Sequence, residues 1–560
     1  MTALQNSATE NAAPTGVVAP NERAAPHTDP LTSTTLTWGA GMPLRGDRVL
    51  RYVNAFCPEC HAADVQQPLA EVRRLSGWLV ERDDRVWLER GCPTHGFQRT
   101  MYDESPEILT YLEQWTAPTK WHVPDSPGNY DPIPQAYLRG LGEMQTQHTC
   151  ILLEDIIEAC NLRCPTCFTS SSPNLSGVVP IEQILANIDQ RLARENGRLD
   201  VVMLSGGEPT LHPQLPDLLD ELAARNIVRT LLNTNGVLIA RDDSLVELLQ
   251  RHRDRVEVYL QFDGLRAESS KHHRGGDLTA TKQLAVARLS QAGIFTTLTM
   301  TAALGVNDDE IGDVILTALE TPYVGGVVIQ PVFGSGRSQP LDPMNRLTHT
   351  GALARFGPQT GGVVSWRDLT ALPCSHPHCA SVGYMLRNDD GEWRSLVGIV
   401  GVERLKEHLG LIANRVADRE LPRDLRIAVQ QSLMGLLSDQ SSLTHPEVMA
   451  LWKDVCEACD LGIGSLMKLT AAVGLPGGRE KLRRMLGERV VRITVKPFMD
   501  RHTMIEERLT QCCVHVGTRS ESQDQCAPFC AVQAWPQLSD QRLSTAHRRA
   551  GVDLTLGARP

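Results

Sequence analysis

The sequence predicts an α/β protein in which a partial (β/α)6 barrel lies between a small N-terminal metal module and a cysteine-rich C-terminal region. From about residue 150 to 337, apolar strand-like runs alternate with amphipathic helical stretches, a pattern typical of βαβ units. Most of the 15 cysteines form close-spaced groups, within this segment and on both sides of it. Clustered cysteines are typical of metal ligands.

Length and charge limit the classes of protein that fit. With 560 residues the chain is long enough for three or four domains. The net charge of -11 argues against a nucleic-acid partner, which needs a basic surface.

The most apolar stretch, from Ser395, is interrupted by charged residues, so no transmembrane segment is expected. The first 45 residues lack the apolar core of a secretory signal. We therefore expect a cytoplasmic protein without disulfides, with peripheral membrane contact left open.

Composition and cysteine spacing divide the chain into segments. The start is rich in Ala, Pro, Thr and Ser, which predicts disorder. The expected segments are a disordered tail (1–45), a metal module with a linker (46–140), the α/β core (141–345), a helical extension (346–450), a cysteine-rich domain (451–537) and a flexible tail (538–560).

The N-terminal module contains a Cys-x2-Cys pair and a Cys-x2-His pair. Cys57 and Cys60 come first, a hairpin with Asp83-Asp84 at its turn follows, and Cys92 and His95 come after it. Three sulfurs and one nitrogen form a tetrahedral set for zinc or for a rubredoxin-like single iron. The alternative is that His95 is an ordinary turn residue beside Gly96.

Six strands are expected in the core. They lie at residues 151–157, 200–205, 230–235, 256–264, 295–302 and 326–332, with amphipathic helices between them, such as those at 180–195 and 214–226. Regular alternation of this kind predicts a parallel sheet with its chemistry at the carboxyl ends of the strands.

Two motifs follow the first two core strands. Cys160, Cys164 and Cys167 form a Cys-x3-Cys-x2-Cys set, which can hold three irons of a [4Fe–4S] cluster and leave the fourth iron open to a ligand. One unit later comes Ser205-Gly206-Gly207-Glu208-Pro209. Its glycines allow close backbone approach to a ligand, and Glu208 can accept hydrogen bonds from a ligand ammonium.

These motifs, with Asn233-Thr234-Asn235-Gly236 after the third strand, resemble the radical S-adenosylmethionine (SAM) superfamily. The resemblance implies that SAM binds the open iron and is cleaved by one electron to methionine and a 5′-deoxyadenosyl radical, which abstracts hydrogen from an unactivated carbon. It implies SAM contacts by Ser205, Gly206, Gly207, Glu208 and Asn235, and an electron donor such as flavodoxin or ferredoxin.

Flanking motifs resemble a narrower group, the tetraether-lipid synthases and their relatives named as pterin dimethyltransferases. The motifs are CPEC and CPTHG near the N-terminus, PCSHPHC from Pro373, FMDRHTMIEERLTQCCVH from Phe498 and PFC from Pro528. Between Cys513 and Cys526 this chain has VHVGTRSESQDQ, and the resemblance does not extend to the spacing of these two cysteines.

Eight cysteines after the core match the number needed by two fully ligated [4Fe–4S] clusters. They are Cys374, Cys379, Cys456, Cys459, Cys512, Cys513, Cys526 and Cys530. In an extended segment, Cys512 and Cys513 would face opposite sides and serve one cluster each. The alternative is a single auxiliary cluster, with one of that pair a packed apolar residue.

Three functions fit these features. The first is a radical SAM enzyme that joins two unactivated carbons of lipid alkyl chains, as the resemblance to tetraether synthases implies. The second is a radical SAM methyltransferase acting on a pterin or another small heterocycle. The third, a non-catalytic iron–sulfur electron carrier, leaves the three-cysteine loop and the SGGEP motif without a role. The sequence leaves open the substrate, the number of auxiliary clusters, iron or zinc in the N-terminal module, the oligomeric state and the reductant.

Overall fold

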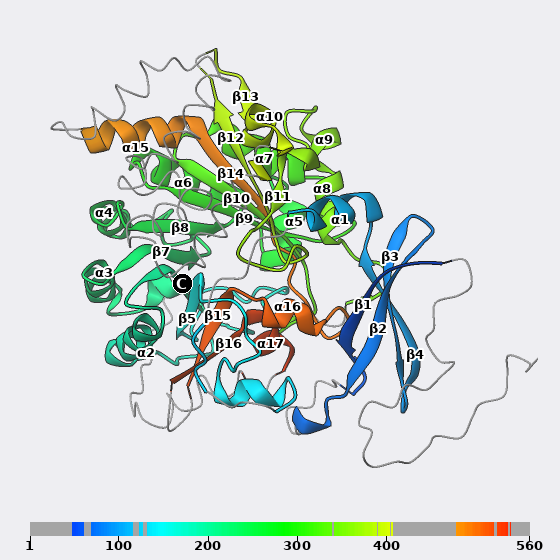
Figure 1. Ribbon diagram of the computed structural model, residues 1–560. Coiled ribbons are helices and arrows are strands. Elements are labelled where there is room, and N and C mark those ends of the chain that lie inside the picture. Colours follow the sequence, from blue (N-terminus) through cyan, green and yellow to red (C-terminus); the bar gives the residue numbers. More distant parts are fainter. Residues whose placement is uncertain are drawn as a thin grey trace, which may run out of the picture.

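The computed structural model describes residues 47–60, 69–115, 122–126, 131–338, 341–388, 390–403, 405–406, 478–519, 524–535 and 538. Within them the chain forms a four-stranded sheet and a twelve-stranded sheet (Figure 1). Cys456, Cys459 and the tail at 1–45 lie outside the described residues, as does nearly all of the tail at 538–560.

The small N-terminal sheet is antiparallel, in the order β1-β2-β3-β4. Its strands are β1 (Arg48–Phe56), β2 (Arg74–Arg82), β3 (Arg85–Cys92) and β4 (Gly96–Asp103). Asp83 and Asp84 have φ of 52° and 56°, the conformation of a two-residue hairpin turn, which confirms the expected hairpin. Asn54 N donates to Glu507 Oε1 over 3.0 Å, so this sheet is joined to helix α16 (Glu506–Thr510).

The six expected core strands are all present and parallel. They are β5 (Ile151–Ile157), β6 (Leu199–Gly206), β7 (Ile227–Thr234), β8 (Val256–Gln261), β9 (Thr296–Ala302) and β10 (Val324–Pro331). The helices between them are α2 (Ile181–Arg194), α3 (Leu215–Ala223), α4 (Asp243–Arg251), α5 (Ala267–Arg274), α6 (Thr279–Gln291) and α7 (Ile311–Glu320).

Two further parallel strands come from the C-terminal region and extend the core sheet at both sides. β14 (Val490–Val495) pairs with β10, and β15 (Val514–Arg519) pairs with β5. Antiparallel strands continue outward, with β12 (Ser381–Arg387) on β14 and β16 (Asp524–Pro528) on β15. The cysteine-rich region expected as a separate domain therefore shares its sheet with the core, because it supplies backbone partners to both outer core strands.

Residues 346–450, expected as a helical extension, also contribute strands where they are described. The α-helices and strands there are α8 (His349–Ala354), α9 (Phe356–Gln359), β11 (Thr370–Ala371), β12, β13 (Trp393–Ser395) and α10 (Leu396–Val400). Three further α-helices lie elsewhere in the chain: α1 (Pro106–Glu113), α15 (Gly478–Arg489) and α17 (Phe529–Ala534). The valine and tyrosine of β12 favour a strand, and β14 gives that strand a partner.

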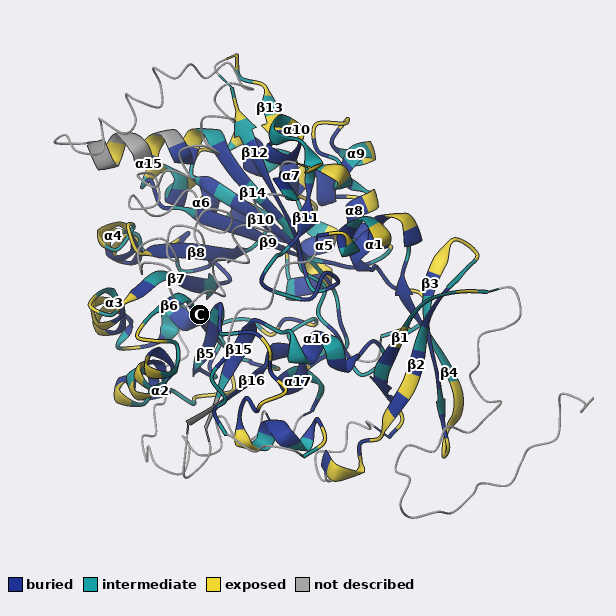
Figure 2. Ribbon diagram, in the orientation of Figure 1, coloured by how far each residue is buried: buried dark blue, intermediate teal, exposed yellow. Residues whose placement is uncertain are grey.

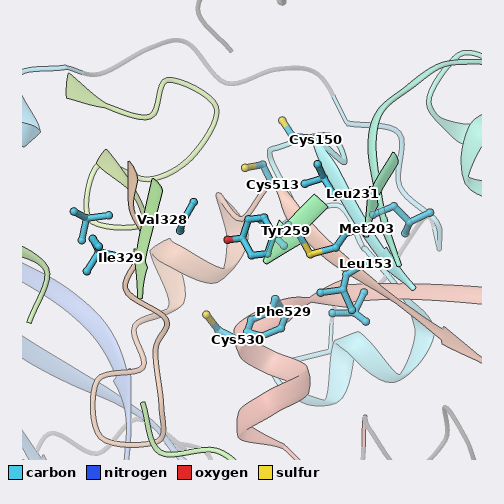
Figure 3. Packing of buried hydrophobic residues seen from close by; sticks show 14 of the residues in the cluster. Cys150, Leu153, Met203, Leu231, Tyr259, Val328, Ile329, Cys513, Phe529 and Cys530 are labelled. Carbon is cyan, nitrogen blue, oxygen red and sulfur yellow. The ribbon is translucent and has the colours of Figure 1, made fainter. Parts of the chain in front are cut away.

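Apolar side chains from neighbouring strands fill the interior of the sheet. Leu153, Met203, Leu231 and Tyr259 come from β5, β6, β7 and β8 and converge on one region (Figure 3). Helices α2, α3 and α4 cover the core strands and expose their outer faces (Figure 2). None of the helices in the described part of the chain has both the length and the apolar character needed to cross a membrane.

Candidate functional site

The loop with Cys160, Cys164 and Cys167 follows the carboxyl end of β5, as the sequence predicts. Cys160 N donates to Ser172 O over 3.3 Å, and Cys167 N donates to Cys164 O over 3.3 Å. Cys164 is buried, whereas Cys160 and Cys167 are half-buried. The fold thus holds three thiols on one short loop that is open enough to receive a metal cluster.

The electrostatics of Cys160 reflect the charged groups around it. Burial, together with the charges of Glu208, Cys164 and Cys167, raises the pKa of Cys160 to about 12, although a hydrogen bond from Leu162 N opposes this effect. Three thiolates at this position therefore require a cation that offsets both burial and mutual repulsion. A set of three cysteines on one loop fits a [4Fe–4S] cluster with one open iron.

A segment after β10 makes hydrogen bonds to the cysteine loop, and sequence reasoning missed this contact. Arg337 Nε donates to Cys164 O over 2.8 Å, and Arg337 N donates to Cys167 O over 3.0 Å. A Cβ on Gly336 would lie 2.3 Å from Cys167 O, so only glycine fits there. The Gly-Ser-Gly-Arg run after a core strand was the available signal.

The two glycines of the SGGEP motif have a packing role. A Cβ on Gly206 would lie 2.3 Å from Ile157 O, and one on Gly207 would lie 2.1 Å from Ala159 O. Gly207 N donates to Ile157 O over 2.6 Å. We expected these glycines to let the backbone come close to a ligand. Instead they let it come close to the chain just before Cys160, and this contact positions that cysteine.

Glu208 is buried, and its carboxylate joins two loops. Oε1 accepts from Thr210 N, from Thr210 Oγ1 and from Thr234 Oγ1, at 3.2, 2.6 and 2.6 Å. Oε2 accepts from Asn235 N over 2.8 Å. A carboxylate has about four acceptor positions, and Oε2 uses only one of its own here. Oε2 is therefore the oxygen of Glu208 that we predict to contact the SAM ammonium.

We expect Glu208→Gln to weaken SAM binding about tenfold to a hundredfold while cluster iron stays unchanged, because a charge-assisted hydrogen bond contributes about 1.5–3 kcal/mol. Glu208→Ala removes four bonds to protein donors as well and should also lower the melting temperature. SAM affinity is measured by equilibrium binding under anaerobic conditions. Thr234→Val, which removes the bond to Oε1 and a bond from Gly236 N but none to Oε2, is the matched control and should retain SAM affinity. Unchanged affinity in Glu208→Gln contradicts the assignment.

Asn235, at the end of β7, reaches the cysteine loop. Its Nδ2 donates to Asn161 Oδ1 over 2.7 Å and lies 4.0 Å from Cys160 Sγ. Ser205 is buried on β6, and its Oγ accepts from Asn233 Nδ2 over 3.3 Å. The structure therefore brings Asn235 to the cysteine loop, whereas Ser205 makes a hydrogen bond to the neighbouring strand β7. The SAM contacts of these residues stay predictions.

Buried cations lie near Cys164, and sequence reasoning did not identify them. Burial lowers the pKa of Arg274, but the Asp263 carboxylate and the Cys164 thiol act against this and raise it. Arg274 donates to both Asp263 oxygens at 2.6 Å. Burial lowers the pKa of Lys282 to about 8, and its Nζ donates to Asn235 O. Positive charge here favours thiolate ligands.

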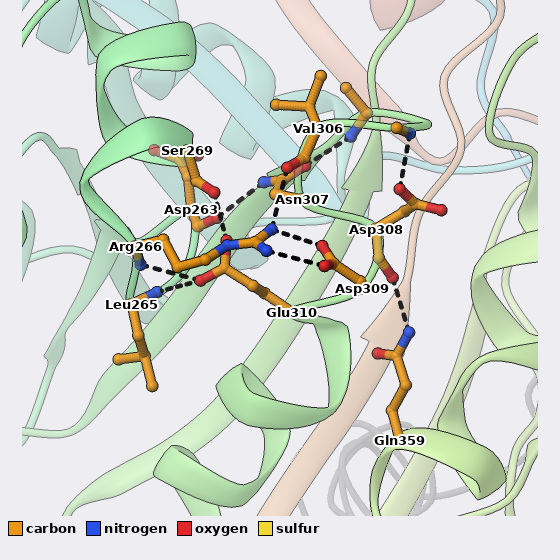
Figure 4. A network of polar contacts seen from close by, with 12 residues as sticks. Asp263, Leu265, Arg266, Ser269, Val306, Asn307, Asp308, Asp309, Glu310 and Gln359 are labelled. Carbon is orange, nitrogen blue, oxygen red and sulfur yellow. Dashed lines mark hydrogen bonds and ion pairs between the residues drawn. The ribbon is translucent and has the colours of Figure 1, made fainter.

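A polar network fixes the loop that carries Asp263 (Figure 4). Asn307 Nδ2 donates to Asp263 O over 2.7 Å. Glu310 Oε1 accepts from Leu265 N and Arg266 N at 2.7 and 2.9 Å. These bonds hold the carboxyl end of β8 in one conformation, so that Asp263 orients Arg274.

The N-terminal ligand set comes together as predicted. The ligand atoms of Cys57, Cys60, Cys92 and His95 all lie within 4.8 Å of one another. Cys60 Sγ and Cys92 Sγ are 3.8 Å apart, and His95 Nδ1 lies 3.4, 3.3 and 3.6 Å from the three sulfurs. Such spacing fits one tetrahedral ion with bonds of about 2.0–2.3 Å.

The C-terminal cysteines separate into groups that the sequence did not show. Cys513 lies beside Cys374, with 3.7 Å between their sulfurs. Burial and the charges of Cys530 and Cys379 raise the pKa of Cys512, so Cys512 faces a different pair of thiols. Arg508 Nε donates to Cys379 Sγ over 3.3 Å.

Cys526 lies apart from both groups. Burial raises its pKa to about 12, Arg191 opposes this effect, and Asp125, Glu154 and Glu195 add to it. Its neighbours thus include charged side chains, and its role as a cluster ligand stays a prediction.

Two sequence profiles match the chain. The radical SAM superfamily profile matches residues 155–318, and that of the HMPTM N-terminal zinc ribbon domain matches residues 49–104. The first covers the end of β5, the cysteine loop and the core strands β6 to β9. The second covers the four-stranded sheet with its Cys3His set.

Named relatives and solved structures are also similar. The 7,8-dihydro-6-hydroxymethylpterin dimethyltransferase of Methanocaldococcus jannaschii is 23% identical, over 85% of this chain and 92% of its own. The GTP 3′,8-cyclase of Moorella thermoacetica is 28% identical, over 43% of this chain and 78% of its own. Among solved structures, SuiB of Streptococcus suis bound to S-adenosylmethionine is 19% identical, with a TM-score of 0.28, over 33% of this chain and 40% of SuiB.

The resemblance inferred from the cysteine motifs is thereby confirmed at the level of the domains. A zinc ribbon of the HMPTM type, at residues 49–104, precedes a radical SAM domain at residues 155–318.

Proposed function

We propose that the protein abstracts hydrogen from a carbon of a pterin or another small heterocycle and joins that carbon to the methyl group of a second SAM, which leaves as S-adenosylhomocysteine; the reductant supplies one electron for each SAM. The observation that carries this proposal is the loop with Cys160, Cys164 and Cys167, which places three thiols at the carboxyl end of β5. A [4Fe–4S] cluster with bound SAM supplies a 5′-deoxyadenosyl radical when it is reduced. An electron-carrier role alone would give the SGGEP loop no function.

The protein's own residues would hold and orient this chemistry. Cys160, Cys164 and Cys167 supply the iron ligands, and Arg274 and Lys282 place positive charge beside them. Glu208 Oε2 and Asn235 face the loop from the ends of the next two strands. Rigid, prearranged groups of this kind orient a cofactor without reorganisation during the reaction.

Methyl transfer is the first candidate because the relative from M. jannaschii, similar over nearly its full length, is named as a pterin dimethyltransferase. Carbon–carbon coupling of lipid chains, the first expectation from the sequence, is the alternative. We further propose a reduced flavodoxin or ferredoxin as electron donor, one or two auxiliary [4Fe–4S] clusters, and zinc or a single iron in the ribbon.

The test incubates the anaerobically reconstituted full chain with SAM, a strong reductant and either a hydroxymethylpterin or a diether lipid. We expect 5′-deoxyadenosine together with a pterin product heavier by one or two methyl groups, detected by mass spectrometry. If the lipid is coupled and no methylated pterin forms, carbon–carbon coupling takes the place of methyl transfer as the proposed reaction. Absence of 5′-deoxyadenosine from the reconstituted protein would contradict both.

A further inference from the structure

A layer of polar side chains crosses the inner face of the core sheet near the carboxyl ends of its strands. Each core strand contributes one residue to this polar layer, which consists of Asp155, Ser205, Asn233, Gln261, Thr301 and Gln330. Asp155 pairs in register with Ser205 at one side of the layer. Thr301 pairs with Gln330 at the other side. Because residues that pair across parallel strands face the same side of the sheet, these side chains lie on one face.

Apolar side chains lie one level below the polar layer. They come two positions earlier on their strands and converge in Figure 3: Leu153, Met203, Leu231, Tyr259 and Val328. These apolar residues are buried, whereas the members of the polar layer on β7 to β10 are half-buried, although both neighbours of each one along the chain are buried. The polar layer is therefore the level at which solvent, and so a ligand, reaches the inner face of the sheet.

Hydrogen bonds connect the polar layer to the surroundings of the cysteine loop. Gln261 Nε2 donates to Asn233 Oδ1 over 3.0 Å. Arg274 Nη2 donates to Gln261 Oε1 over 2.9 Å and to Thr301 Oγ1 over 3.2 Å. Arg274 also interacts with the Cys164 thiol. A ligand bound at the polar layer would therefore lie next to the loop at which the proposed chemistry begins.

Gln330, on the outermost of the core strands, has hydrogen-bonding capacity to spare. Its Nε2 donates to Tyr259 OH over 3.0 Å. An amide has two N–H donors and an oxygen with two acceptor positions, and among the described residues Gln330 Oε1 accepts no hydrogen bond. Burial raises the pKa of Tyr259 to about 12, so its phenol keeps the O–H donor at neutral pH. The two side chains together offer donors and an acceptor to a ligand.

Four phenylalanine rings gather at the same carboxyl end. Phe168 comes directly after Cys167, Phe333 follows β10, Phe498 follows β14, and Phe529 begins α17. The ring centroids of Phe168 and Phe529 are 5.7 Å apart, and those of Phe498 and Phe529 are 4.4 Å apart. Phe168 and Phe498 are half-buried. Flat apolar surfaces near hydrogen-bonding groups suit a ligand that has apolar faces and a polar edge.

We propose that Gln330 and Tyr259 determine which substrate the protein accepts, because they bind the polar edge of a flat heterocycle and exclude an alkyl chain. Amino, carbonyl and ring N–H groups would replace the water at Gln330 with new hydrogen bonds. An alkyl chain would remove this water and leave the amide unpaired, which costs more free energy than burial of one methylene group contributes. This inference rests on the proposed function and adds the residues that select its substrate.

The test measures ligand binding to the full chain, reconstituted anaerobically with SAM and kept without reductant so that no turnover occurs. Equilibrium dialysis gives the affinity for a hydroxymethylpterin in the wild type, in Gln330→Met and in Tyr259→Phe. The matched control is Gln250→Met, the same substitution at an exposed residue of α4. Cluster iron and SAM affinity are measured in parallel and should stay at the wild-type level in all of them.

We expect Gln330→Met and Tyr259→Phe each to weaken pterin binding about tenfold, the effect of one lost hydrogen bond to a ligand, and Gln250→Met to leave it unchanged. If Gln330→Met binds and methylates the pterin as the wild type does, the inference is overturned and the proposed function stands. If pterin binding depends on Gln330 but reduction yields no methylated pterin, the inference is supported and the proposed function is contradicted.

A comparison of ligands on the wild-type chain covers the case in which a variant does not fold. Quinazoline is a fused bicyclic ring of similar size that lacks the amino and carbonyl groups of a pterin. We expect it to bind on the order of a hundredfold more weakly than the hydroxymethylpterin, since two hydrogen bonds to the protein are lost. Equal affinity for the two rings, or displacement of the pterin by a diether lipid, overturns the inference.

Discussion

A chain in which Cys160, Cys164 and Cys167 are all replaced by alanine will not cleave SAM. The three thiols are the iron ligands that we propose, and they share the one loop that follows β5. Without them no iron is held next to Glu208 and Asn235. The measurement is formation of 5′-deoxyadenosine by anaerobically reconstituted protein with a strong reductant, and we expect it to fall to the level of the buffer.

The same variant should keep its fold and its other metals. Cys160 and Cys167 are half-buried, so their truncation leaves the sheet intact, and total iron should fall by only about four atoms. Cys526→Ala serves as the control and should retain SAM cleavage. Full activity in the triple variant would mean that another group of cysteines holds the catalytic cluster.

The second large effect concerns the ribbon, which we expect to fold in isolation only with metal. Its strands bury Val53, Leu79 and Leu88 in the main hydrophobic core, which a fragment of residues 47–104 lacks. Among the residues that the structure describes, the apolar cluster around the metal site itself consists of Cys57, Cys60, Cys92 and Leu75. A structural zinc ion contributes about 10–16 kcal/mol in comparable small domains, far more than such a cluster.

Amide NMR spectra of the fragment measure this effect. With zinc the resonances should be dispersed, and with a chelator they should collapse to the range of an unfolded chain. Cys92→Ser should abolish the zinc-induced spectrum, whereas Glu59→Ala, an exposed residue between two ligands, should not. A dispersed spectrum in chelator would show that the metal has no role in folding.

The sequence predicted local features of this protein well. Each core strand is a short apolar run, so its position follows from periodicity. The CPEC ligands follow β1 and the CPTHG ligands lie at the turn between β3 and β4, so the members of each pair are close in sequence. Long-range features were not predictable. Gly207 is required because Ala159 O lies against it, and nothing near Gly207 in sequence indicates that contact. Arg274 and Lys282 were missed because basic residues on helices usually face solvent.

Contacts between cysteines of separate strands were not predictable for the same reason. Cys150 has no cysteine near it in the sequence, but strand pairing places it beside Cys513. Cys526, predicted as a ligand, lies on β16 near charged side chains, and its role stays a prediction. Spacing along a chain predicts ligands on one loop, whereas ligands from separate strands depend on sheet register.

The position of β14 and β15 has a consequence for synthesis on the ribosome. β5 and β10 are translated well before these strands, which are their partners at the two sides of the core sheet. Until the last part of the chain emerges, both strands present unpaired N–H and C=O groups, which favour association between nascent chains. Completion of the sheet by β14 and β15 therefore depends on protection of the nascent core strands from such association.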